Sequence, residues 1–352
     1  MYPRLKINCS KIKENTALIS EQAAQKGIEI YAVTKVYCGM PEVAKASLEG
    51  GAVGLADSRL ENFETLKDVP CDKILLRLPM QSEASKVVSL CDISLNSELE
   101  TMRALNLAAE KLNKKHRIIL MIDLGDLREG ILKEQVDETI SEILKLENIQ
   151  LEGIGVNLTC YGGVIPGTDN LGELVSIGNH IEAAFGIKLK VISGGNSSSL
   201  FLLENGQMPA KINNLRIGEA IVLGRETAYG EIISGAHEDA FILEAEIIEL
   251  KVKDSVPTGT IGMDAFGNKP TFEDKGKMLR AIAAVGRQDI NPDGLTPLDS
   301  RIEIIGASSD HMIMDFTATE NEYKVGDILK FKLDYGAMLK ACTSAYIHKS
   351  MV

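Results

Sequence analysis

Apolar stretches typical of buried strands alternate with longer, helix-forming stretches from the amino terminus to about Gly230. About eight such strands occur, and this alternation predicts an α/β fold, a closed parallel (β/α)8 barrel of the TIM type. An open doubly wound sheet needs fewer strands and usually carries a glycine-rich dinucleotide loop, which is absent here. The predicted strands are Ile28–Val33, Ala52–Ala56, Ile74–Leu78, Ile93–Leu95, Ile118–Ile122, Ile154–Asn157, Leu189–Ile192 and Leu215–Val222.

The pattern changes after about Gly230, where short strands follow one another with few helical stretches between them. Close spacing of short strands indicates a small all-β domain. We therefore predict a barrel over residues 1–232 and a carboxyl-terminal all-β domain over residues 233–352. The strands predicted in this domain are Ala240–Lys253, Leu279–Val285, Arg301–Ile305, Met312–Phe316 and Ile328–Leu333.

The composition of the 352 residues is that of an ordinary globular protein, with 45% hydrophobic and 25% charged residues. A formal net charge of −12 argues against nucleic acid or an anionic membrane as a partner. We expect a cytoplasmic protein, because no signal peptide and no apolar stretch of membrane-spanning length is found. The six scattered cysteines lack Cys-x-x-Cys spacing, so we expect free thiols and no metal site.

Lys35 directly follows the first predicted barrel strand. Barrels of this type carry their active sites at the carboxyl ends of the strands. A lysine amine in its neutral form is a nucleophile that can form a Schiff base with an aldehyde. The alternative is a strand-end lysine that only reaches water, and the other polar residues at this end of the barrel favour the reactive role.

Two stretches near the last predicted strands could hold a phosphate. Ser193–Ser199 contains two glycines and follows the seventh strand, where barrels often bind phosphate, and its candidate ligands are Asn196 and Ser197. In the eighth strand, Arg216 lies in an apolar run and needs a partner, while Gly218 would let a phosphate approach closely. The alternatives are a solvated turn and a structural ion pair between Arg216 and a neighbouring carboxylate.

Arg128 follows the fifth predicted strand, Asn157 ends the sixth, and both could reach the same mouth of the barrel. A solvated Arg128 on an acidic loop is the alternative. A reactive amine, a phosphate cradle and two arginines at one end of a barrel suit pyridoxal 5′-phosphate, which carries an aldehyde, a phosphate and a ring nitrogen.

Five motifs stand out along the chain: Ala32-Val33-Thr34-Lys35-Val36 with Cys38-Gly39, Leu55-Ala56-Asp57-Ser58-Arg59, Gly195-Asn196-Ser197-Ser198-Ser199, Leu215-Arg216-Ile217-Gly218-Glu219 and Gly286-Arg287-Gln288-Asp289. On these motifs the sequence resembles, over essentially its whole length, the alanine racemase-type (fold type III) pyridoxal-phosphate enzymes, and it is closest to their ornithine racemase branch. The resemblance implies that Lys35 forms the Schiff base and that Arg216 faces the pyridine nitrogen. It also implies that Ser197 and Gly218 hold the phosphate and that Arg128 lies near the phenolic oxygen.

Departures from alanine racemases put alanine as the substrate in doubt. Their catalytic tyrosine has no counterpart in Val285–Asp289, and a lysine carbamylated in many of them corresponds to Met121. Their Cys-Met-Asp-Gln segment corresponds to Ser308–His311. Racemisation needs a proton-transfer group on each face of the α-carbon. Lys35 can serve one face, and the candidates for the other are Asp289, Asp310 and His311, each of which could instead be purely structural.

The leading prediction is an isomerase, a racemase that interconverts L- and D-ornithine or a related diamino acid, whose ammonium group could bind Glu219, Asp289 or Asp310. The resemblance implies a homodimer in which the β-domain segments Gly286–Asp289 and Ser309–His311 reach the neighbouring barrel. Alternatives are an alanine or broad-specificity racemase, a non-catalytic pyridoxal-phosphate homeostasis protein, and a phosphosugar enzyme in which Lys35 bonds to the substrate.

Overall fold

The computed structural model describes residues 1–319 and 322–352, which form two compact units. One unit is Cys9–Glu238, and the other joins Met1–Asn8 to Asp239–Val352. The chain therefore divides differently from the predicted boundary between residues 232 and 233, and its first residues leave the barrel. The reason is that strand β1 (Arg4–Ile7) pairs with β10 (Phe241–Asp254) and β16 (His348–Met351), which buries Leu5 and Ile7.

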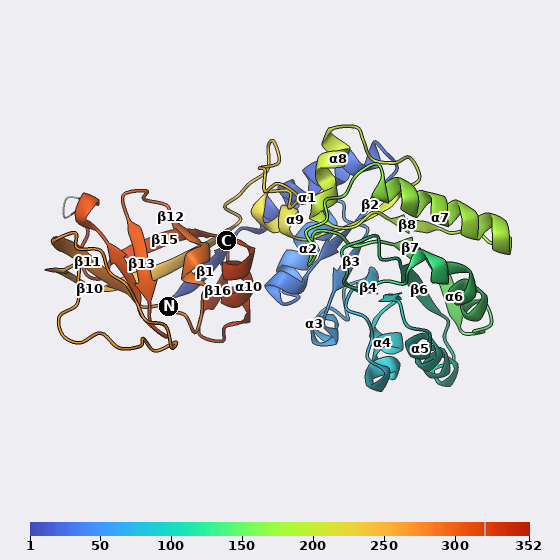
Figure 1. Cartoon of the computed structure of the whole chain (residues 1–352), viewed down its shortest axis with the longest axis horizontal. Helices are drawn as coiled ribbons and strands as arrows, with labels where there is room; N and C mark the ends of the chain where they lie inside the picture. The colour runs from blue at the N-terminus through green and yellow to red at the C-terminus, as the bar shows by residue number, and fades with distance from the viewer. Residues whose placement is uncertain (320–321) are drawn as a thin grey trace. The chain divides into compact units, whose positions relative to one another are not determined.

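The unit Cys9–Glu238 is a closed barrel of eight parallel strands surrounded by helices, as predicted (Figure 1). The barrel closes where β2 pairs with β9, with Ile30 opposite Leu215 and Ala32 opposite Ile217. The strands are β2 (Glu29–Val33), β3 (Gly54–Asp57), β4 (Asp72–Leu75), β5 (Ile93–Asn96), β6 (His116–Met121), β7 (Ile149–Gly155), β8 (Val191–Ser193) and β9 (Asn214–Ile217). The helices are α1 (Cys9–Ala24), α2 (Pro41–Glu49), α3 (Leu60–Thr65), α4 (Ala84–Leu90), α5 (Leu99–Lys111), α6 (Val136–Ile143), α7 (Asn170–Phe185), α8 (Leu200–Glu204) and α9 (Glu219–Leu223).

The last predicted strand, Leu215–Val222, is only half correct, because β9 ends at Ile217 and α9 begins at Glu219. The buried run Ala220–Leu223 is apolar throughout, and a short apolar run fits a buried helix as well as a strand. Gly218 separates the two elements. A Cβ atom at Gly218 would lie 3.0 Å from Cβ of Val33 on the neighbouring strand β2, so only glycine fits without displacement.

The barrel interior is apolar on one side and more polar on the other. Residues of β2 to β6, including Tyr31, Val33 and Met121, form its buried apolar cluster. On β7, a Cβ atom at Gly155 would lie 3.2 Å from Cβ of Ser193. The side formed by β7, β8 and β9 thus leaves room for polar side chains, including Ser193 and the buried Arg216.

The second unit is built on a mainly antiparallel sheet in the order β12-β15-β10-β11-β14-β13, with β1 added beside β10 and β16 beside β1. This arrangement confirms the predicted all-β domain, although the unit also contains helix α10 (Tyr335–Thr343). The strands not yet bounded are β11 (Lys277–Ala283), β12 (Leu295–Pro297), β13 (Glu303–Ala307), β14 (Met312–Asp315) and β15 (Ile328–Leu333).

Candidate active site

Lys35 opens a short 3-10 turn, η1 (Lys35–Tyr37), directly after β2. The chain is anchored on both sides of it, because Val33 packs in the barrel interior and Tyr37 is buried. Gly39 closes the turn with a φ of +63°, where a Cβ atom would lie 2.9 Å from Cβ of Asn62. Within residues 1–319 and 322–352, no hydrogen bond or ion pair engages the Lys35 amine. The amine is therefore available to a ligand at the barrel mouth.

Arg216 is buried on β9, with 3% of its surface exposed. Its Nη1 donates to Oγ of Ser193, and its Nη2 donates to the Val156 carbonyl at 2.9 Å. Burial lowers the pKa of Arg216 to about 10, so the guanidinium stays charged at neutral pH. The alternative of a structural ion pair is wrong, because no carboxylate within the described residues pairs with Arg216. The guanidinium group donates only to neutral acceptors, so its positive charge is available to a ligand.

The predicted phosphate stretch forms the turn η4 (Ser197–Ser199), which leads into α8. Asn196 caps this turn, with its Oδ1 accepting from the Ser198 N–H at 2.9 Å. Ser197 Oγ accepts from the Ala220 N–H at 3.3 Å, which brings the turn to the start of α9, beside Gly218. Oγ of Ser198 is buried and has no hydrogen-bond partner among the residues that the structure describes. A buried hydroxyl without a partner is costly, and a phosphate oxygen would satisfy it.

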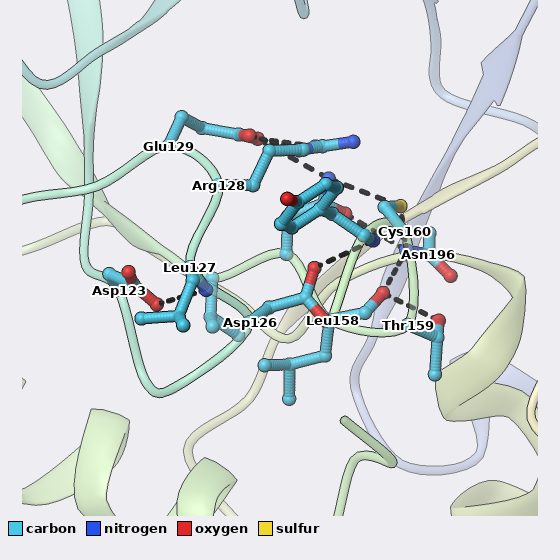
Figure 2. A network of polar contacts seen from close by, with 12 residues as sticks. Asp123, Asp126, Leu127, Arg128, Glu129, Leu158, Thr159, Cys160 and Asn196 are labelled. Carbon is cyan, nitrogen blue, oxygen red and sulfur yellow. Dashed lines mark hydrogen bonds and ion pairs between the residues drawn. The ribbon is translucent and has the colours of Figure 1, made fainter. Parts of the chain in front are cut away.

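Arg128, Asn157 and Asn196, which were predicted separately, belong to one network of polar contacts (Figure 2). Glu129 accepts from Nε and Nη2 of Arg128 and, at 3.3 Å, from Nδ2 of Asn157. Oδ1 of Asn157 accepts from Nδ2 of Asn196 at 2.9 Å. Sγ of Cys160 lies 3.5 Å from both amide nitrogens. The alternative of an Arg128 that only meets solvent is wrong, because Glu129 holds its guanidinium against the residues that lead to the phosphate turn.

The predicted second-base candidates lie in the other unit, where two loop segments pair through their backbones. The N–H groups of Arg287 and Gln288 donate to the carbonyls of Ser308 and Ser309, each at 2.8 Å. A Cβ atom at Gly286 would lie 2.4 Å from the Asp310 nitrogen, so glycine permits this approach. We call Gly286–Asp289 with Ser308–His311 the loop pair. It brings together two segments that are separate in the sequence.

The side chains of the loop pair are held differently from one another. Asp289 is 8% exposed, and its Oδ1 accepts from Oγ of Ser344 at 2.6 Å. Asp310 is exposed, and its Oδ1 accepts from Nδ1 of His311 at 3.0 Å. That hydrogen bond, the largest influence, lowers the pKa of Asp310. Asp310 is therefore an exposed carboxylate at neutral pH, whereas Asp289 is buried and hydrogen-bonded to Ser344.

Sequence reasoning did not assign a role to Asp57 or Glu129. Asp57 ends β3, is fully buried, and accepts a hydrogen bond from Oγ1 of Thr34, the residue before Lys35. In the sequence it stood within the motif Leu55–Arg59, at the end of an apolar strand, with no role of its own. Glu129 directly follows Arg128 in a loop with several acidic residues, so nothing in the sequence distinguishes it from its neighbours. Met121, which takes the place of a carbamylated lysine in the resemblance, is fully buried in the barrel interior.

The barrel mouth fits the groups of pyridoxal phosphate. It has a lysine amine and a buried hydroxyl without partners in the described part of the chain, an arginine without a carboxylate, and glycine at Gly195 and Gly218. No cluster of three His, Cys, Asp or Glu placed to bind a metal ion is found among residues 1–319 and 322–352. No helix in those residues has the length and apolar character needed to cross a membrane.

Comparison with protein families and curated proteins finds relatives along the whole chain. A family model described as alanine racemase, N-terminal domain, matches residues 7–226. An ornithine racemase from Acetoanaerobium sticklandii is 49% identical, with 100% of both chains covered. A lysine racemase from Thermotoga maritima is 41% identical over 99% of this chain and 98% of the relative.

Solved structures with the same fold include alanine racemases that are distant in sequence. The enzyme from Streptomyces coelicolor has a TM-score of 0.78 at 16% identity, covering 99% of this chain and 97% of that one. The enzyme from Bartonella henselae, solved with covalently bound pyridoxal phosphate, has a TM-score of 0.75 at 16% identity and covers 99% of each chain. These structures share the two-part architecture described above.

Proposed function

The chain belongs to the alanine racemase family, and from this we propose that it is a pyridoxal-phosphate-dependent racemase of a diamino acid, with ornithine as the leading substrate. The observation that carries the proposal is the full-length similarity to an ornithine racemase, supported by the lysine racemase. Both relatives extend over the second unit as well as the barrel. A barrel-only carrier of the cofactor would not account for that second unit.

The barrel mouth supplies the residues that would hold the cofactor. Ser197, Ser198 and the backbone around Gly218 would hold its phosphate, and Lys35 would bond to its aldehyde carbon. Bound pyridoxal phosphate would supply a conjugated ring that withdraws electrons from the α-carbon of an attached amino acid. Arg216, charged at neutral pH, would donate to the ring nitrogen, and a donor at that nitrogen opposes its protonation. This limits electron withdrawal and favours proton exchange over reactions such as transamination.

Arg128 would serve the same cofactor from the loop after β6. Burial, the largest influence, lowers the pKa of Arg128, but the hydrogen bonds that it donates to Glu129 and nearby negative charges raise it overall. Arg128 therefore stays cationic beside an anionic oxygen. Glu129 and Asn157 fix its orientation, since a guanidinium held along one edge presents its other edge to a ligand.

Proton transfer requires one group on each side of the α-carbon. The Lys35 amine would take or return a proton on one side. Asp289, Asp310 and His311 are the proposed candidates for the other side. Of these, the exposed His311, whose Nδ1 is hydrogen-bonded to Asp310, is better suited to exchange a proton than the buried Asp289, whose Oδ1 accepts from Ser344. We propose a homodimer in which the loop pair of one subunit serves the barrel of its partner.

The proposed preference for a diamino acid rests on an anionic contact to the side-chain ammonium group. The carboxylates could instead have been neutralised by Arg216 or Arg287. Arg216 donates to Ser193 and Val156, and the carboxylate nearest to Arg287 is that of Asp293, at 3.9 Å. Among the described residues Asp310 pairs with neither arginine, and its hydrogen bonds with His311, Ser308 and Ser309 all use Oδ1, which leaves Oδ2 for a substrate ammonium group. A charge-assisted hydrogen bond of this kind is worth roughly 1.5–3 kcal/mol of binding in general.

A substrate panel tests this proposal. Purified protein loaded with pyridoxal phosphate should interconvert the D and L forms of ornithine, with lower kcat/KM for lysine, because one methylene is discriminated by only about 1–3 kcal/mol. Alanine and norvaline should be poor substrates. Norvaline has the chain length of ornithine without the terminal amine, so equal kcat/KM for both would contradict an ammonium contact. No racemisation of any member of the panel would contradict the function itself.

A further inference from the structure

The carboxylate of Asp57 lies beside the lysine turn and has no part in the function proposed above. Asp57 is 0% exposed and ends β3, whose neighbour in the barrel is β2. In the described part of the chain, no lysine, arginine or histidine forms an ion pair with it. A buried carboxylate without a cation is costly to keep, since it loses its hydration. We therefore expect the Asp57 carboxylate to stabilise a particular local structure that offsets this cost.

Asp57 is hydrogen-bonded to the segment that carries Lys35. Its Oδ2 accepts from Oγ1 of Thr34, the residue directly before the lysine. Both of its oxygens accept from Nδ2 of Asn62, each at 3.0 Å. Asn62 in turn packs against Gly39, at the other end of the lysine turn.

The backbone of the same segment completes the arrangement. The Thr34 N–H donates to the Ala56 carbonyl at 2.8 Å, which joins the end of β2 to the residue before Asp57. The Gly39 N–H donates to the Thr34 carbonyl at 3.2 Å and closes the turn over Lys35. Residues 34–39 are thus held at their first residue by Asp57 and at their last by Asn62, which Asp57 orients.

We propose that Asp57 is a positioning residue that holds residues 34–39 in one conformation, so that the Lys35 amine stays in register with the phosphate turn. The chemical benefit rests on the function proposed above, because a reacting group must be held within a fraction of an ångström of its working geometry. The lysine side chain is long and flexible, so a rigid backbone turn is the means by which the fold can limit its range.

The rival explanation is that Asp57 only forms a local turn ahead of α3, since its Oδ1 also accepts from the Arg59 N–H at 2.9 Å. Asparagine forms such turns equally well. Asp57→Asn therefore preserves the turn and the volume, but it places an amide group where Thr34 and Asn62 both need an acceptor. Thr34→Val removes the same contact from the other side, and Thr34→Ser retains it.

The test is hydrogen exchange, followed by mass spectrometry, on the purified full chain with and without pyridoxal phosphate. Amides of residues 34–39 should exchange about tenfold faster or more in Asp57→Asn and in Thr34→Val, and at the normal rate in Thr34→Ser. Ser94→Ala is the matched control, because it removes a buried hydrogen bond to His116 on neighbouring strands without touching the lysine turn. It should lower Tm and leave exchange in 34–39 unchanged.

Kinetics provide the second readout. In Asp57→Asn and Thr34→Val, kcat should fall by about tenfold to a hundredfold while KM changes little, because misplacement of a reacting group acts on the chemical step. Unchanged exchange of residues 34–39 in Thr34→Val, or a change no larger than in Ser94→Ala, would overturn the proposal even if Asp57→Asn fails to fold. The exchange result needs no substrate, so it separates failure of this inference from failure of the racemase proposal.

Discussion

The barrel mouth and the loop pair carry similar kinds of side chain, but the two regions hold them in different ways. At the mouth, several groups around Lys35 are buried in the fold: Arg216 and Ser197 are each 3% exposed, and Asp57 is fully buried. In the loop pair, the side chains of Asp310 and His311 are 68% and 45% exposed, and Oδ1 of Asp310 accepts from His311, Ser308 and Ser309. The mouth is organised by strands from the whole barrel, whereas the loop pair is organised by backbone hydrogen bonds between two loop segments.

This difference suits the mouth to binding the cofactor and the loop pair to proton transfer. A buried, hydrogen-bonded site is preorganised and pays no cost of ordering when a rigid cofactor binds. Exposed groups reorient easily and exchange protons with water, which suits a residue that must give up and regain a proton in each cycle. In the proposed homodimer, the fixed half and the adaptable half of one active site would come from different subunits.

The largest expected effect comes from removing the lysine of the mouth. Lys35→Ala should lower kcat by on the order of 10³-fold or more, because it removes a proton-transfer group and the covalent anchor of the cofactor. Borohydride reduction of the loaded wild type and peptide mapping should place the label on Lys35. Label on another lysine would contradict the assignment. Lys133→Ala, which alters an exposed lysine paired with Glu173, is the control.

Mixing two inactive variants tests the division between subunits directly. Lys35→Ala and a His311→Ala/Asp310→Ala double variant, refolded together, should recover activity that neither has alone. Heterodimers would contain one site with an intact lysine and an intact loop pair. An active monomer in sedimentation, or no recovery in a verified heterodimer, would show that both regions act within one chain or that the loop pair is not involved.

The next effect concerns the buried arginine of the mouth. Arg216→Lys should keep the charge but lose the two-pronged contact to Ser193 and Val156, and should raise the barrier by about 2–4 kcal/mol through loss of a preorganised donor. Arg216→Glu should in addition permit protonation of the ring nitrogen and new transaminase activity. Arg301→Gln, on a surface ion pair with Asp299, should change neither. Unchanged racemisation in Arg216→Glu would remove Arg216 from the site.

Acid should affect the two units differently. Burial lowers the pKa of His116 in β6 to about 4, from 6.5 when unfolded, so the unfolded barrel binds this proton more readily. The free energy of unfolding of the barrel unit should therefore fall by roughly 2–3 kcal/mol as pH drops from 6.5 to 4. In the other unit, hydrogen bonds from Lys253 and Lys251 lower the pKa of Glu249 to about 2, and that stabilisation is lost only as pH falls from 4.5 toward 2.

Hydrogen exchange resolved by unit measures this difference at pH 7 and pH 4.5. His116→Gln should remove most of the acid sensitivity of the barrel, while His348→Gln, at an exposed position of β16, should not. Equal acid sensitivity of the barrel in wild type and His116→Gln would show that another group dominates.

The smallest expected effect concerns the loop pair. Asp310→Asn should lower kcat/KM for ornithine by about tenfold, because the ammonium contact loses its charge, and should leave the low value for norvaline nearly unchanged. Asp264→Asn, at an exposed turn in the same unit, is the control because Asn can form the same backbone contacts. An equal loss for both substrates would mean that Asp310 serves proton transfer or structure instead of side-chain recognition.

Much of the barrel could be predicted because its signal is local. Each strand contains a short run of apolar residues, so the order of elements and the placement of Lys35 after β2 follow from the chain itself. The end of β9 could not be predicted, since Ala220–Leu223 is apolar whether it forms a strand or a helix. Nor could the membership of Met1–Asn8 be predicted, because a four-residue strand does not reveal which distant strand it pairs with.

The sequence by itself determined which residues stand at the strand ends, and therefore that an amine, two arginines and a phosphate turn share one mouth. Only the tertiary structure decided how each is held: Arg216 by neutral acceptors, Arg128 by Glu129, and the lysine turn by Asp57. The physical reason is that strand position depends on the periodicity of neighbouring residues, whereas a hydrogen-bond partner depends on which strands become adjacent when the barrel closes. The hydrogen bonds between Thr34 and Asp57, and between Arg216 and Ser193, join residues that are more than 20 positions apart in the chain. The sequence around each residue therefore does not reveal its partner.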